Sequence, residues 1–84
     1  MPKTAQISVS TTRTLVVPEL IGDQSVYLHS SSGTVYIGGP DVTTANGYRL
    51  DNGDKLTIMV GDYEALYAIT SSGTANLFVM TQIN

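Results

Sequence analysis

Residues 26–37 read VYLHSSSGTVYI and residues 66–77 read LYAITSSGTANL, and the two stretches align without a gap. In both, an apolar run that contains a tyrosine leads into Ser-Ser-Gly-Thr, and a second apolar run follows. Apolar runs on either side of a small polar turn are typical of a β-hairpin. The sequence therefore predicts two hairpins of one design, and an internal two-fold repeat that relates the two halves of the chain.

The similarity between the halves extends backwards when one residue is inserted. Residues 20–23 (LIGD) then pair with residues 59–62 (MVGD). Between the halves, residues 38–47 (GGPDVTTANG) are rich in residues that break strands and form turns. This segment is expected to be the long connection between the two halves.

Apolar side chains alternate with a period of two along much of the chain, and helical periodicity is absent. Tyr27 and His29 lie on one face of their predicted strand, and Phe78 alternates with Leu77 and Val79. Short strands spaced by about eight to twelve residues predict an all-β fold, an antiparallel β-sandwich or jelly roll of about eight strands. The expected core comprises Leu28, Val35, Ile37, Leu56, Ile58, Leu66, Ala68, Leu77 and Val79.

The composition favours a single small domain, residues 1–84, that shares its surface with a partner. Charged residues make up 13% of the 84 residues and hydrophobic residues 42%, whereas about a quarter charged is usual. A surface rich in hydroxyls and poor in charges is easier to desolvate against another protein. Interface cores are likewise depleted in charged residues. With a small core, no cysteine and little charge with which to protect its sheet edges, we expect a homo-oligomer, most readily a trimer.

Several partners and locations are disfavoured by the same composition. The four basic residues are scattered, which argues against nucleic-acid binding, and no apolar run approaches the ~20 residues of a membrane helix. The start of the chain lacks the apolar core of a signal peptide, so synthesis in a cytosol is expected. The basic residues are Lys3, Arg13, Arg49 and Lys55.

The sequence carries no recognisable catalytic, metal-binding or cofactor motif. His29 is the lone histidine and has no carboxylate at ligand spacing. No Gly-x-Ser-x-Gly motif is present, and the Gly38-Gly39 pair lacks the lysine of a phosphate loop. Residues 51–54 (DNGD) lack the full register of a calcium loop. We therefore expect no catalytic residue, no metal and no cofactor, and a protein that is not an enzyme.

Three segments carry a resemblance to a known family: residues 35–43 (VYIGGPDVT), 47–56 (GYRLDNGDKL) and 66–74 (LYAITSSGT). They resemble small β-rich virion proteins of tailed bacteriophages, which decorate or cement capsids or occur as head or tail modules. The resemblance spans about two-thirds of the chain, residues 26–80. It implies a capsid decoration protein that binds and stabilises the head shell, with the major capsid protein or another virion protein as partner. It further implies a final location in the virion after synthesis in the host cytoplasm.

Two other functions stay open at this point. The first is a binding module of a phage tail or fibre that contacts a host glycan. The second is a small cellular carbohydrate-binding domain. Exposed aromatic side chains clustered around one pocket would favour glycan binding, whereas a flat hydroxyl-rich face would favour attachment to a capsid.

Two segments are expected to contact the partner. Residues 2–17 form either an N-terminal arm that adds to a neighbour as an extended strand or the first strands of the sandwich itself. Residues 38–47 form a stiff loop that loses little entropy on docking. The predicted partner-binding residues are Thr4, Gln6, Ser8, Ser10, Arg13, Pro40, Val42, Thr43 and Ala45.

Overall fold

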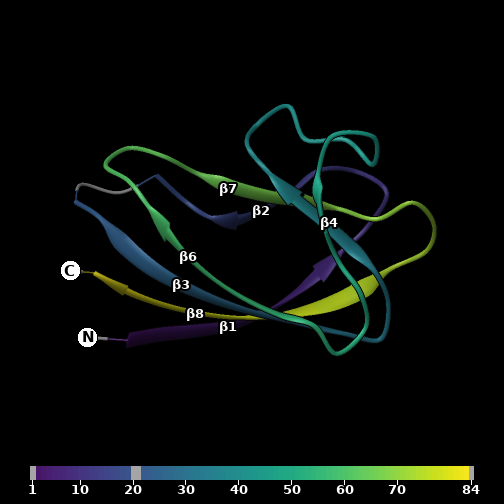
Figure 1. The fold of residues 1–84 in the computed structure, drawn as a ribbon, viewed down its shortest axis with the longest axis horizontal. Coiled ribbons are helices and arrows are strands. Elements are labelled where there is room, and N and C mark those ends of the chain that lie inside the picture. Colours follow the sequence, from purple (N-terminus) through teal and green to yellow (C-terminus); the bar gives the residue numbers. More distant parts are fainter. Residues whose placement is uncertain (1, 20–21, 84) are drawn as a thin grey trace.

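The computed structural model describes residues 2–19 and 22–83 as two four-stranded antiparallel sheets that lie face to face (Figure 1). Sheet A has the order β1-β8-β3-β6 and sheet B the order β2-β7-β4-β5. Within the described ranges no helix is long and apolar enough to span a membrane. The strands are β1 (Pro2–Val9), β2 (Thr14–Val17), β3 (Gln24–Ser31), β4 (Val35–Gly38), β5 (Tyr48–Leu50), β6 (Lys55–Val60), β7 (Leu66–Ile69) and β8 (Ala75–Ile83).

The order of these strands is that of a jelly roll. Every connection between successive strands passes from one sheet to the other, except the one between β4 and β5, which are neighbours in sheet B. Two sheets wound in this way, with the first and last strands paired, are the jelly-roll arrangement of eight strands. The predicted all-β sandwich with a jelly-roll plan is therefore confirmed.

The topology also contains the predicted internal two-fold repeat. Exchanging β1 with β5, β2 with β6, β3 with β7 and β4 with β8 converts the order β1-β8-β3-β6 into β5-β4-β7-β2. That is the order of sheet B read in reverse. The connection β3–β4 is thereby equivalent to β7–β8, so the two Ser-Ser-Gly turns occupy matching positions. Leu20 and Ile21, on which the extension of the repeat depends, lie outside the described residues.

The two turns are not hairpins, and that prediction is wrong. β3 lies in sheet A and β4 in sheet B, and β7 and β8 are likewise in different sheets. Near each turn the main chain stays bonded to the other half of the chain: the N–H of Ser30, in β3, donates to Asp54 O at 3.0 Å, and the Thr70 N–H donates to Ser10 O at 2.9 Å. The chain is thus carried across the sandwich instead of back along its own strand.

The core lies between the sheets and largely matches the predicted one. Of the predicted core residues, Leu28, Val35, Ile37, Leu66, Ala68, Leu77 and Val79 are buried. Ile58 is 38% exposed, so this prediction is corrected, whereas Leu56 is half-buried and packs against the core. Both lie on β6, the edge strand of sheet A, where neighbouring side chains cover only one flank.

The N-terminal segment consists of first strands and not of an arm. β1 pairs with β8 without interruption from Pro2–Gln82 to Val9–Ala75, and β2 pairs with β7. The beginning of β1 and the end of β8 therefore lie side by side (Figure 1). Val9 and Val17 are fully buried, which shows that this segment belongs to the body of the sandwich.

Candidate functional site

The loop between β4 and β5, residues 39–47, packs closely against β4. Val42 is only 2% exposed and packs directly over Gly38. A Cβ atom added to Gly38 would lie only 2.8 Å from Val42 Cγ2. The loop is closed by hydrogen bonds: the Gly47 N–H donates to Thr43 O at 2.9 Å and the Thr43 N–H donates to Asn46 Oδ1 at 2.7 Å. The loop is therefore an ordered part of the fold that needs a bare glycine beneath it.

Arg13 joins this loop to the connection between β1 and β2. Its Nη1 donates a hydrogen bond to Pro40 O. The β1–β2 connection is itself held by local bonds, in which the Thr12 N–H donates to Ser10 Oγ at 3.2 Å and Thr14 Oγ1 donates to Thr12 O at 3.0 Å. Two segments predicted separately to contact a partner thus meet in space.

A shallow groove of about 680 Å³ lies where they meet, on the outer face of sheet B. We call it the sheet B groove. Its sides come from the two loops and its floor from β7, with the exposed Leu15 of β2 beside Tyr67. Hydroxyls and apolar groups dominate its lining, which consists of Thr11, Thr12, Arg13, Pro40, Val42, Thr43, Tyr67 and Ile69.

The structure sorts the predicted partner residues into three groups. Arg13, Pro40, Val42 and Thr43 line the sheet B groove, although Val42 is buried and is corrected from a free contact residue to a support of the loop. Ser8 and Ala45 are exposed elsewhere, on β1 and on the loop, and Ser10 is half-buried in its turn. Thr4 and Gln6 lie on the opposite side of the molecule, on the outer face of sheet A.

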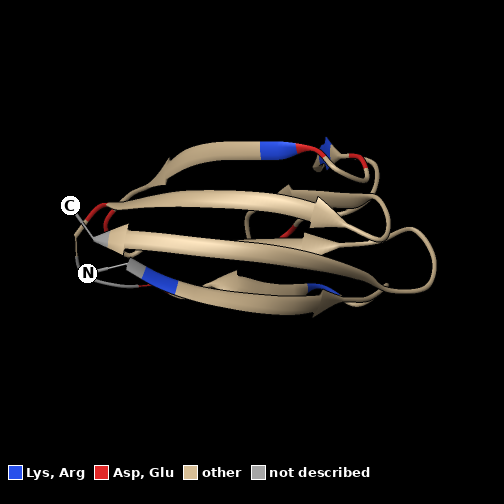
Figure 2. Ribbon diagram, turned by 90° about the horizontal axis from the view of Figure 1, so that it is seen from below, with Lys and Arg blue, Asp and Glu red and all other residues tan. Residues whose placement is uncertain are grey.

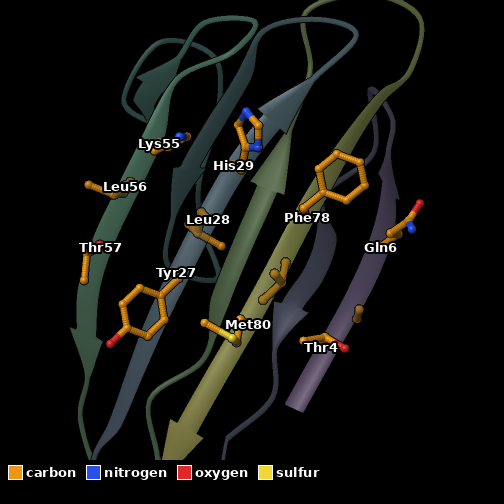
Figure 3. A pocket seen from close by; sticks show the side chains of 12 residues that line it. Thr4, Gln6, Tyr27, Leu28, His29, Lys55, Leu56, Thr57, Phe78 and Met80 are labelled. Carbon is orange, nitrogen blue, oxygen red and sulfur yellow. The ribbon is translucent and has the colours of Figure 1, made fainter. Parts of the chain in front are cut away.

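That outer face carries a second groove, of about 650 Å³, which we call the sheet A groove (Figure 3). Two cross-strand rows of side chains form it. The first row is Gln6, Phe78, His29 and Lys55, and the second is Thr4, Met80, Tyr27 and Thr57. In each row the two central strands supply aromatic or apolar groups and the two edge strands supply polar groups. The rings of His29 and Phe78 are 5.9 Å apart and tilted by 48°.

The aromatic centre of this groove was missed from the sequence. The signal was present, because β3 and β8 carry apolar side chains on both faces: Leu28 and Val79 point into the core, whereas Tyr27, Phe78 and Met80 point outward. When a strand carries apolar side chains on both of its faces, one face packs in the core and the outward face is a candidate surface for binding. The pairing of β3 with β8 was needed to see that these side chains form one patch.

Charge is distributed unevenly between strands and loops. All seven carboxylates lie in connections between strands, and none lies on a strand (Figure 2). The basic side chains Lys3, Arg49 and Lys55 are on strands. Both sheet faces therefore lack negative charge, and Lys55 supplies the formal charge beside the sheet A groove.

The carboxylates of the β5–β6 turn are engaged in local bonds. Asp54 Oδ2 accepts the Asp51 N–H at 2.9 Å, and Asp51 Oδ1 accepts Arg49 Nε at 2.7 Å. The hydrogen bond and the charge of Asp51 raise the pKa of Arg49 above its ordinary value, so this guanidinium stays charged. Among the residues that the structure describes, no three His, Cys, Asp or Glu side chains gather in a way that could hold a metal ion.

Comparison with known proteins yields a likeness in fold. No protein-family profile and no curated protein matches the chain. A solved structure of Bacillus endospore appendages, described as a family of disulfide-linked pili, superposes with a TM-score of 0.61 at 16% sequence identity. The match covers 96% of this chain and 83% of that chain. At this identity the likeness establishes the all-β fold alone, and this chain has no cysteine with which to form a disulfide.

Proposed function

We propose that the chain is a non-catalytic structural protein of a bacteriophage virion, a decoration protein that binds the outside of the head shell and stabilises it. The sheet B groove is its attachment site, and the partner is the major capsid protein or another virion protein. The protein acts in the virion after synthesis in the host cytoplasm.

The observation that carries this proposal is the convergence of residues 11–13 and 40–43 into one groove. Its loops are already held by hydrogen bonds and by the Arg13–Pro40 contact, so little conformational entropy is lost when a partner docks. The lining includes Arg13 and Tyr67 and no Lys, Asp or Glu, and interface cores are enriched in Arg and aromatic residues and depleted in Lys and Glu. The fold likeness to a subunit of a surface appendage is in keeping with a structural role.

We further propose that the protein forms a homo-oligomer, most readily a trimer. Each sheet ends in strands whose outer main-chain groups face away from the sheet, and Tyr48 and Met59 on the edge strands β5 and β6 are both 62% exposed. Uncovered edges favour pairing with another chain, and each edge strand carries at most one charged residue: Lys3 on β1, Arg49 on β5 and Lys55 on β6. Sedimentation velocity at tens of micromolar tests this, and a monomer at every concentration would contradict self-association without the particle.

The attachment site is tested with heads that lack the protein. Purified protein is mixed with such heads, and binding is followed by co-sedimentation and by the temperature at which the heads disrupt. Thr12→Lys, which places a long charged side chain on the exposed lip of the sheet B groove, is expected to reduce binding at least about tenfold. The free energy needed to bury an unpaired charge in an interface is large enough to weaken binding tenfold or more.

Thr57→Lys is the matched control, because it makes the same change on the opposite face of the sandwich. It is expected to bind heads like the original chain. Equal binding by Thr12→Lys and the original chain would overturn the assignment of the groove. Failure of the original chain to bind any head protein would overturn the proposed function.

The sheet A groove favours a second candidate function, a tail- or fibre-associated module that binds a glycan. Its aromatic centre can contact the apolar face of a sugar ring, and its polar flanks can bond the sugar hydroxyls. Electron microscopy of virions labelled on this chain distinguishes head from tail.

A further inference from the structure

We infer that the sheet A groove binds an acidic saccharide, with the sugar ring lying over Tyr27, Phe78 and Met80 and its carboxylate directed to Lys55. This inference rests on the second candidate function, glycan binding at this groove, and is independent of the proposed capsid attachment, which uses the opposite face of the sandwich.

The arrangement of the two rows defines the shape of the ligand. The centre of the groove is a block of four side chains on β3 and β8, in which Tyr27 lies opposite Met80 and His29 lies opposite Phe78. Polar groups flank this block on both sides, from β1 and from β6. A ligand that fits must present a flat apolar surface at its centre and hydrogen-bonding groups around its rim. A pyranose ring has this form, since its C–H bonds line its two faces and its hydroxyls project outward.

The size of the groove suits a small ligand. Strands about 4.8 Å apart and rows about 7 Å apart give the two rows a footprint of roughly 14 by 7 Å, on the order of 100 Å². A volume of about 650 Å³ lies within the range of about 300–1,000 Å³ that is usual for small-ligand sites. A short saccharide therefore fits the groove.

The charge around the groove selects for a negative ligand. The strands of sheet A carry Lys3 and Lys55 and no carboxylate. The Lys55 side chain is exposed beside His29, its cross-strand neighbour. Asp54 precedes it, but the Asp54 carboxylate accepts the Asp51 N–H within the β5–β6 turn. A ligand carboxylate can thus approach Lys55 without meeting a negative charge on the face of the sheet.

The aromatic side chains are held in place for stacking. Phe78 and His29 are half-buried and pack against each other at 5.9 Å, which limits the positions that the Phe78 ring adopts. Tyr27, 39% exposed, offers its ring at one side of the block and its hydroxyl at the rim. Figure 3 shows the Tyr27 and Phe78 rings on the same side of the sheet. Ring faces carry negative charge density and attract the weakly positive C–H groups of a sugar.

The test uses two probes that differ only in the carboxylate, methyl glucuronide and methyl glucoside, titrated into the isotope-labelled protein by NMR. For ligands of this size we expect a Kd on the order of 1 mM for the glucuronide. The amide signals of residues 27–29, 55–57 and 78–80 are expected to shift and saturate. The glucoside is expected to bind about two- to fivefold more weakly, which is the range of an exposed ion pair.

Variants assign the two parts of the site. Lys55→Gln is expected to reduce glucuronide affinity to that of the glucoside and to leave glucoside binding unchanged. Tyr27→Ser, at an exposed position where misfolding is not expected, should weaken both probes. Thr12→Lys, on the opposite face, should bind both probes like the original chain, so failure of the capsid proposal leaves this result intact.

Three results would overturn the inference. The first is an absence of saturable shifts with either probe at 50-fold the expected Kd of about 1 mM. The second is shifts confined to the sheet B groove. The third, which removes the acidic preference, is equal binding of the two probes together with no effect of Lys55→Gln.

Discussion

At the scale of single residues, the fold depends on two buried hydroxyls that perform the same task in the two halves. Ser30 is fully buried, and its Oγ donates to Gly33 O at 2.7 Å. Thr70 is 3% exposed, and its Oγ1 donates to Gly73 O at 3.0 Å. Each hydroxyl bonds a carbonyl within a turn that crosses between the sheets, where no strand partner is available. The repeated Ser-Ser-Gly-Thr segments thus mark equivalent crossings.

Removal of either hydroxyl should destabilise the protein by a similar amount. Ser30→Ala and Thr70→Val each leave a partly buried carbonyl without its donor, at an expected cost of about 1–3 kcal/mol. Urea denaturation monitored by circular dichroism measures the change. Ser72→Ala, at an exposed position in the second turn, serves as the control and is expected to change stability by less than about 0.5 kcal/mol. A large cost at one crossing and none at the other would contradict their equivalence.

Adjacent glycines at the end of β4 should differ sharply in their tolerance of a methyl group. A Cβ on Gly38 would lie 2.8 Å from Val42 Cγ2, whereas a Cβ on Gly39 would meet only Asp41 Oδ1 at 3.8 Å. Gly38→Ala is expected to push Val42 outward, at a cost of about 1–3 kcal/mol, and to increase hydrogen exchange in residues 42–47. Gly39→Ala is expected to behave like the original chain, and equal effects of the two changes would show that the loop is not packed as described.

At the scale of strands and turns, period-two alternation predicted the strands and most of the core, because the alternation is a local property of the sequence. It did not distinguish central strands from edge strands. Ile58 and Leu28 alternate equally well in the sequence, but Leu28 lies on the central strand β3 and Ile58 on the edge strand β6. The grooves were also beyond sequence reasoning, since each depends on which strands pair and on where the 39–47 loop folds.

The difference between central and edge strands gives a matched pair of variants. Leu28→Ala removes a side chain that is 2% exposed and is expected to cost about 2–4 kcal/mol. Ile58→Ala removes one that is already partly hydrated and is expected to cost about 1 kcal/mol or less. Differential scanning calorimetry would report the two as unequal shifts of Tm. Equal losses would indicate that β6 is covered in solution, as self-association through this edge would produce.

At the scale of the whole molecule, the two halves of the chain are interleaved. In both sheets the strands of β1–β4 alternate strictly with the strands of β5–β8, so every strand pairing joins one half to the other. Among the described residues, no two strands of the same half pair with each other. The sequence repeat predicted two similar halves, but it could not reveal that neither half contains a sheet of its own.

The interleaving predicts that the chain can be divided into two complementary pieces. Residues 1–44 and 45–84, separated in the exposed loop, should each be unfolded alone and should regain the β-sheet circular dichroism spectrum when mixed in equal amounts. Val26→Asp in the first piece, at a fully buried position, should prevent this recovery and serves as the control. Independent folding of either piece, or no recovery on mixing, would contradict the interleaved topology.

The interleaving of the two halves also provides a way in which copies of this protein could be joined to one another. The loop of residues 39–47 is the link that keeps complementary halves in one chain. If this loop were too short to reverse the direction of the chain, the two halves of one chain could not pair with each other. Each half would instead pair with the complementary half of a neighbouring copy, which is a domain-swapped dimer. Such chains could separate only by unfolding. A protein without cysteine would thereby acquire a linkage that lasts as long as its fold.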